Sequence, residues 1–156
     1  MIFNRRRNGD DTPVTKLQLF HGTDSLDAVR GICIDNFDPR VSGKNATRYG
    51  DGAYFARTSK YSHCYTDSRS ELKFMFVASV LVGDAAQGHK DLRKPPEKPG
   101  QKHESYDSCV DDINQPTMYI LFDRNQHYPE YLIQYKDVAA SQFEIVNVPQ
   151  VCVWIK

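Results

Sequence analysis

The chain has 156 residues, of which 40% are hydrophobic and 26% charged, as in an ordinary globular protein with one domain. Twenty basic and twenty acidic residues give a formal net charge of zero, so overall charge does not imply steering toward nucleic acid. The longest largely apolar stretch is far shorter than the roughly 20 residues of a membrane helix, and no signal-peptide core precedes it. The four cysteines form no CxxC pair. We therefore expect neither a zinc site nor a disulfide framework, but a soluble cytoplasmic or nuclear domain.

The amino-terminal part predicts one strand followed by a short helix. Residues 1–16 are polar and mixed in charge, and we interpret them as a tail or a truncated first element. Alternating leucines predict a strand at residues 17–20. The Thr-Asp-Ser run at 23–25 offers good N-cap residues. Apolar side chains recur at every third position, at Leu26, Val29 and Ile32, which predicts a short amphipathic helix.

Two polar loops interrupt the middle of the chain. Residues 36–52 carry three glycines and a proline and predict a long loop, which at this length inside a compact domain is usually functional. A strand is expected at 53–56 and a helix within 59–65. Residues 74–82 are rich in aromatic and β-branched side chains and predict a further strand. The proline-containing stretch 84–107 predicts a second loop.

The carboxyl-terminal part reads as strands. Residues 118–122 form a continuous apolar run, which is typical of a strand buried on both faces. Further strands are expected at 130–135 and at 143–146. Several strands, few helices and long loops together predict a β-rich α+β domain without internal repeats.

Five segments in order resemble the nicotinamide-binding signature of the poly(ADP-ribose) polymerase superfamily. They are Leu-Phe-His-Gly-Thr at 19–23, Tyr-Gly-Asp-Gly-Ala-Tyr-Phe-Ala at 49–56, Tyr-Ser-His-Cys-Tyr at 61–65, Tyr-Asp-Ser at 106–108 and Tyr-Pro-Glu-Tyr at 128–131. Two more segments, at 36–41 and 43–47, are similar to the mono-transferring branch that often carries zinc-finger and WWE modules. No GxGxxG opens a helix after the first strand, so the pattern is not that of a Rossmann site.

The resemblance implies the ADP-ribosyltransferase fold, with mainly antiparallel sheets, few short helices and a split NAD-binding cleft. The catalytic domain would span 17–136, preceded by the polar segment 1–16 and followed by an extension, 137–156, of unknown role. The cosubstrate would be NAD, with no metal. The partners would be acceptor proteins, including the chain itself, with no membrane and no implied nucleic acid.

The resemblance also assigns the site residues. A catalytic triad would consist of His21, Tyr54 and Met118, and NAD would contact His21, Gly22, Thr23, Tyr54, Ala56, Ser62 and Tyr65. In the family, the glycine backbone and the serine hydroxyl hold the carboxamide of nicotinamide. The two tyrosines stack on its ring, the alanine leaves room for it, and the histidine bonds a ribose hydroxyl. The loop 38–50 would cover the donor pocket.

The third triad position determines the expected product. The glutamate of polymerising relatives begins the strand ten residues before the first tyrosine of Tyr-Pro-Glu-Tyr, and here that position is Met118. A thioether is only a weak hydrogen-bond acceptor, so chain elongation should fail while transfer of a single unit remains possible. Glu130 is interpreted as a plain strand or surface carboxylate. The alternatives are a catalytically silent NAD-binding module and a peptide-binding module of the same family.

Overall fold

A computed structural model describes residues 14–38 and 48–137. Their strands form a seven-stranded sheet in the order β4-β5-β6-β2-β1-β3-β7, antiparallel throughout except for the pair β4–β5. The elements are β1 (Lys16–Thr23), α1 (Leu26–Asp35), β2 (Ala53–Ala56), α2 (Ser59–His63), β3 (Lys73–Leu81), β4 (Ala85–Gln87), β5 (Ser108–Val110), β6 (Met118–Leu121), a 3-10 turn at Arg124–Gln126 and β7 (His127–Tyr135). The β-rich α+β class is therefore confirmed. The strand expected at 143–146, the similar segment at 43–47 and most of the covering loop lie outside the described residues.

Helix α1 begins at the expected capping run, but its packed apolar face differs from the every-third-residue stripe in the sequence. Ser25 is the N-cap, and its hydroxyl accepts a hydrogen bond from the Ala28 N–H at 3.1 Å. Val29 is buried, and Ile32 and Cys33 pack against the same core cluster. Leu26, the first of the three regularly spaced apolar residues, is 54% exposed. The packed stripe follows the spacing i, i+3, i+4 from Val29 rather than every third residue.

The expected loop 84–107 contains a strand that the sequence pattern did not indicate. Strand β4 pairs in parallel with β5, which was also not predicted. Both strands have three residues, too few to show an alternating pattern. Their pairing is reinforced where the Asp84 N–H donates to Asp107 Oδ2 at 2.9 Å. Residues 85–87 therefore form an edge strand of the sheet, while 88–107 contain neither a helix nor a further strand of the sheet, as expected of a loop.

Strand β7 begins at His127, before the expected strand at 130–135, and so it includes Pro129. Pro129 pairs with Ala78 next to a register shift on β3 between Val77 and Ala78. Proline cannot donate to a strand ladder, and it is tolerated here because β7 is the last strand of the sheet and the shift interrupts the ladder. None of the described helices is long and apolar enough to cross a membrane.

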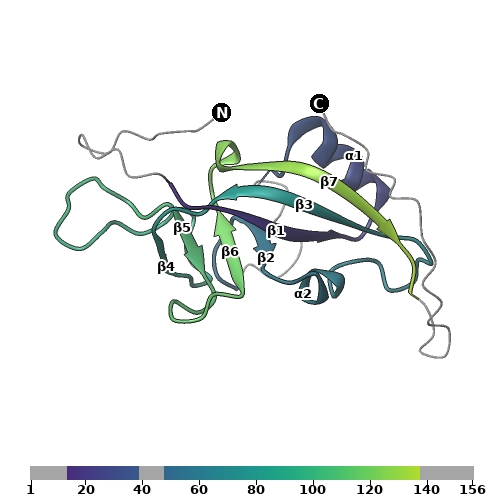
Figure 1. Cartoon of the computed structure of the whole chain (residues 1–156). Helices are drawn as coiled ribbons and strands as arrows, with labels where there is room; N and C mark the ends of the chain where they lie inside the picture. Colours follow the sequence, from purple (N-terminus) through teal and green to yellow (C-terminus); the bar gives the residue numbers. More distant parts are fainter. Residues whose placement is uncertain (1–13, 39–47, 138–156) are drawn as a thin grey trace.

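The two helices lie on opposite faces of the sheet (Figure 1). Along β1, successive side chains alternate between faces, so Leu19 and Gly22 point to opposite sides. Leu19 belongs to the core cluster that contains Val29 of α1. Gly22 instead lies against the backbone of Ser62 in α2. The sheet therefore separates a large apolar core on the α1 side from a smaller, more open region on the α2 side.

Candidate active site

The sheet is split between β1 and β2. These strands share a single register pair, Phe20 with Ala56, and diverge beyond it. Past this point the His21 side chain takes the place of a ladder partner, with its Nδ1 2.8 Å from the Tyr54 carbonyl oxygen. The edge of β1 that follows Phe20 consequently faces β2 without strand pairing in the part of the chain that the structure describes. Such an open edge offers backbone groups to a ligand.

The hydrogen bond to Tyr54 determines the state of the His21 ring. A carbonyl can only accept, so Nδ1 carries the proton and donates it. Burial lowers the pKa of His21, and the bond to the Tyr54 carbonyl offsets this only in part. The ring is therefore neutral at pH 7, and Nε2 is left as an acceptor. That arrangement suits a bond from a ribose hydroxyl.

Register places three of the predicted residues on one face. Ala56 pairs with Met118, and directly paired residues of antiparallel strands share a face. Tyr54 lies two residues before Ala56 and points the same way. His21 lies on the other face, with its ring 4.9 Å from that of Phe37 in an edge-to-face contact. The structure thus brings Tyr54, Ala56 and Met118 together and joins His21 to them through the Tyr54 backbone.

Gly22 and Ser62 are in contact although they are distant in sequence. A Cβ atom at Gly22 would lie 2.0 Å from the Ser62 carbonyl oxygen, so only glycine allows α2 to approach β1 this closely. The Ser62 residue is 3% exposed, and its hydroxyl has no hydrogen-bond partner among the described residues. Among the described residues His127 Nε2 is the one fully buried polar side-chain atom without a partner, so the Ser62 hydroxyl keeps some access to solvent and can be reached by a ligand or water. The structure therefore brings together Gly22 and Ser62, the two residues for which the sequence predicts a carboxamide-binding role.

The Tyr54 hydroxyl anchors the end of the glycine-bearing loop. It accepts a hydrogen bond from the Tyr49 N–H at 2.9 Å and donates one to the Gly50 carbonyl at 2.8 Å. Burial is the main cause that raises the pKa of Tyr54. The hydroxyl is thus protonated at neutral pH and fixed in place. Tyr54 can present its ring and an oxygen lone pair to a ligand without reorganising.

Tyr65 stands at the rim of this region. Its side chain is among the exposed large apolar groups, at 44%. Its hydroxyl lies 3.1 Å from that of Tyr61, and the two rings are 5.6 Å apart. Burial and the bond to Tyr65 raise the pKa of Tyr61. The Tyr65 ring is therefore steadied at one end while a large part of its surface stays open for stacking.

Thr23 is less available for contact with NAD than the sequence suggests. It is 5% exposed, and its hydroxyl donates to the Ser25 carbonyl at 3.1 Å. That bond orients the residue that caps α1. Any contact of Thr23 with a ligand would use the remaining oxygen lone pair.

Asp111 is a residue of this region that the sequence reasoning missed. One carboxylate oxygen accepts bonds from the Thr117 and Met118 N–H groups, each at 2.9 Å, and the other oxygen is bonded by the Thr117 hydroxyl. Burial acts to raise the pKa of Asp111, but these bonds outweigh it and the pKa is lowered. Asp111 therefore fixes the start of β6, where Met118 lies. An aspartate just before a polar turn was the available signal.

Glu130 lies elsewhere. Its carboxylate accepts a bond from Gln18 Nε2 at 2.9 Å and lies 3.8 Å from Lys16 Nζ. These are the contacts of a surface carboxylate between β1 and β7, as we expected. Within the described residues, no group of three or more His, Cys, Asp or Glu side chains is placed to hold a metal ion.

Comparison with known proteins identifies related sequences. Residues 3–137 match the family described as the poly(ADP-ribose) polymerase catalytic domain. The chain is 48% identical over 131 residues to "Protein mono-ADP-ribosyltransferase PARP12" of Mus musculus, covering 84% of this chain and 18% of that protein. It is 39% identical over 142 residues to "Protein mono-ADP-ribosyltransferase PARP11" of Mus musculus, covering 78% of this chain and 43% of that protein. The chain thus spans less than half the length of these relatives.

Proposed function

Because the chain belongs to the poly(ADP-ribose) polymerase catalytic-domain family, we propose that it is a protein mono-ADP-ribosyltransferase, which transfers a single ADP-ribose from NAD to a protein side chain. The observation that supports the proposal is the contact between Gly22 and Ser62, which places the Ser62 side chain beside the open edge of β1. Acceptor proteins, including the chain itself, are the proposed partners. We place the domain in the cytoplasm or nucleus, since the three described cysteines are free thiols.

The pocket residues fit the nicotinamide half of NAD. A carboxamide both donates and accepts hydrogen bonds, which suits the backbone of Gly22 together with the Ser62 hydroxyl. The flat ring suits the faces of Tyr54 and Tyr65. On the other face of β1, His21 Nε2 is the free acceptor for a ribose hydroxyl.

The reaction replaces one bond of the ribose anomeric carbon by another. The bond to nicotinamide nitrogen breaks, the acceptor oxygen or nitrogen forms a new bond to that carbon, and the acceptor proton passes to solvent. Positive charge develops on the ribose in the transition state, as in glycoside cleavage. The residues described here act by holding nicotinamide and ribose in place. Met118 supplies no carboxylate to activate a second sugar, so the product carries single units.

Incubation of the folded chain with NAD labelled in its adenylate half tests the activity. We expect labelling of the chain or of an added acceptor, with mass spectrometry finding only single ADP-ribose units. Ladders of longer chains would contradict the role assigned to Met118. Folded chain that binds a nicotinamide mimic but stays unlabelled would instead identify the alternative, a catalytically silent NAD-binding module.

Tyr65→Ala tests the position of the pocket. The substitution removes an open stacking face, and we expect it to abolish the rise in Tm that benzamide, a nicotinamide mimic, produces in the unsubstituted chain. A ligand at 100 times its Kd stabilises by about 2.7 kcal/mol, so the loss is easily measured. Tyr61→Phe is the matched control. It removes the hydroxyl that bonds Tyr65 but keeps both rings, so the stacking face and the rise in Tm should be retained. If Tyr65→Ala keeps the full shift, the assigned pocket is misplaced.

A further inference from the structure

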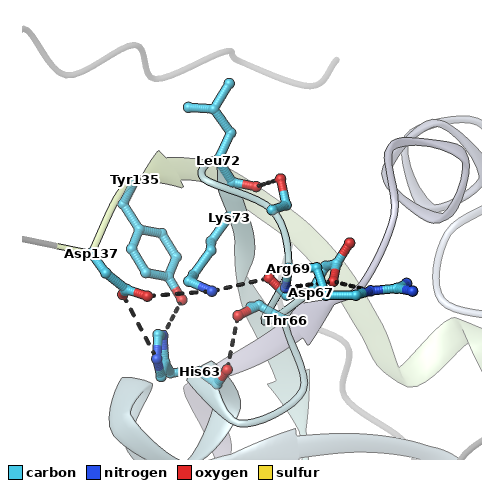
Figure 2. A network of polar contacts seen from close by, with 9 residues as sticks. His63, Thr66, Asp67, Arg69, Leu72, Lys73, Tyr135 and Asp137 are labelled. Atoms are coloured by element: carbon cyan, nitrogen blue, oxygen red, sulfur yellow. Dashed lines mark hydrogen bonds and ion pairs between the residues drawn. The ribbon is translucent and has the colours of Figure 1, made fainter.

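A polar network links the end of α2 to β3 and β7 (Figure 2). His63 Nδ1 lies 2.8 Å from the Tyr135 hydroxyl, and His63 Nε2 lies 3.8 Å from an Asp137 carboxylate oxygen. Lys73 Nζ lies 3.3 Å from the other oxygen of Asp137 and donates to the Asp67 carbonyl at 3.0 Å. The network therefore connects three segments that are far apart along the chain.

Lys73 is the buried member of this network, whereas the His63 and Asp137 side chains are 42% and 62% exposed. The Lys73 side chain is only 5% exposed, although it begins strand β3 near the surface. A buried ammonium group is tolerated only when oxygen atoms compensate for its lost hydration. The ion pair between Lys136 and Glu71 joins nearby segments, but its side chains are 51% and 81% exposed. Exposed pairs of that kind contribute little.

Helix α2 needs a contact with the rest of the fold. It has five residues, and a helix this short is not stable without tertiary contacts. At β1 the Ser62 carbonyl lies against Gly22, which has no side chain. His63 directly follows Ser62 and precedes Tyr65 by two residues. Its carbonyl is also held by the Thr66 hydroxyl at 2.8 Å. The bond from His63 to Tyr135 is therefore a side-chain tether from the pocket-bearing helix to the far strand β7.

We propose that His63, Tyr135, Asp137 and Lys73 form a positioning network for the nicotinamide pocket. The network holds the carboxyl end of α2 so that the Ser62 hydroxyl and the Tyr65 ring keep their places opposite Gly22 and Tyr54. None of the four side chains contacts the ligand; they act through α2. That this pocket binds nicotinamide rests on the proposed function, whereas the tether itself does not depend on it.

Tyr135→Phe is the sharpest test, because it removes one oxygen atom and keeps the ring beside His63. We expect amide hydrogen exchange at Ser62, Tyr65 and Thr66 to accelerate while exchange at Val29 in α1 is unchanged. We also expect benzamide to bind about five- to tenfold more weakly, as the loss of one ordinary hydrogen bond implies. Adding His63→Leu to Tyr135→Phe should weaken binding no more than His63→Leu alone, since both remove the same contact.

Lys136→Gln is the matched control. It breaks the neighbouring surface ion pair with Glu71 and should change neither exchange in α2 nor benzamide affinity. The proposal is overturned if Tyr135→Phe leaves both readouts unchanged, or if exchange accelerates in α2 without loss of affinity. Equal acceleration at every amide with unchanged affinity would overturn it too, since that marks a merely structural role. If the unsubstituted chain fails to bind benzamide, the proposed function fails, and exchange in α2 still decides whether the tether exists.

Discussion

Replacement of Gly22 by alanine is expected to abolish benzamide binding and to lower the free energy of unfolding by about 1–3 kcal/mol. The added methyl carbon would lie 2.0 Å from the Ser62 carbonyl oxygen and 3.0 Å from its carbonyl carbon. Both are backbone atoms, so no side-chain rotation relieves the clash. Helix α2 must move away from β1, and Ser62 moves with it. Thermal shift with benzamide and urea unfolding measure the two effects.

Gly31→Ala is the control for this substitution. Gly31 lies in α1, and a Cβ there meets nothing within 4 Å. Alanine is the better helix former, so we expect a gain of about 0.5–1 kcal/mol in stability with benzamide binding intact. A Gly22→Ala protein that binds benzamide as tightly as the unsubstituted chain would show that α2 is not held against β1 as described.

Acidification below pH 6.5 is expected to destabilise the fold through His127. This residue is 4% exposed and packs against Phe37 and Phe55, and its Nε2 has no hydrogen-bond partner. Burial is the main cause that lowers the pKa of His127 from 6.5 to about 4. Between these values the unfolded chain binds the proton and the folded chain does not, so stability falls as pH falls. The difference between the unfolded and folded pKa values lowers the free energy of unfolding by about 3 kcal/mol between pH 7 and pH 4.

Urea unfolding at several pH values measures this loss, with His127→Leu as the comparison. Leucine is of similar size and cannot be protonated, so the variant should lose about 3 kcal/mol less between pH 7 and pH 4. Well above pH 6.5 His127 is neutral in both states and makes no contribution to the pH dependence. The acidic side chains titrate equally in both proteins and cancel in the difference. Parallel stability curves for the two proteins would contradict the assignment.

The third position of the triad and Asp111 belong to one structural unit. Met118 begins β6, and Asp111 holds that beginning through two backbone N–H groups. The Asp111 carboxylate is therefore occupied in fixing the backbone at Met118. This agrees with a transferase that positions its donor and leaves activation of the acceptor to the acceptor itself.

Most strands of the sheet could be predicted because each shows its pattern within a few residues. The buried run that became β6 and the apolar segment that became β3 are examples. Strands β4 and β5 could not be predicted, since three residues carry no period and their burial comes from pairing with each other. The exposure of Leu26 could not be predicted for a related reason. Periodicity identifies an apolar stripe, but only the docking of α1 decides which residues of the stripe are covered.

For the site, the sequence alone determined which chemical groups are available. His21, Gly22, Tyr54, Ser62, Tyr65 and Met118 were all identified from it, and the expected product follows from Met118. Only the tertiary structure decided how these groups meet. It placed His21 on the opposite face from Tyr54, pressed α2 against Gly22 and brought His63 to Tyr135. Local patterns encode period and burial, whereas the pairing of distant segments depends on how strands and helices pack, which no local pattern specifies.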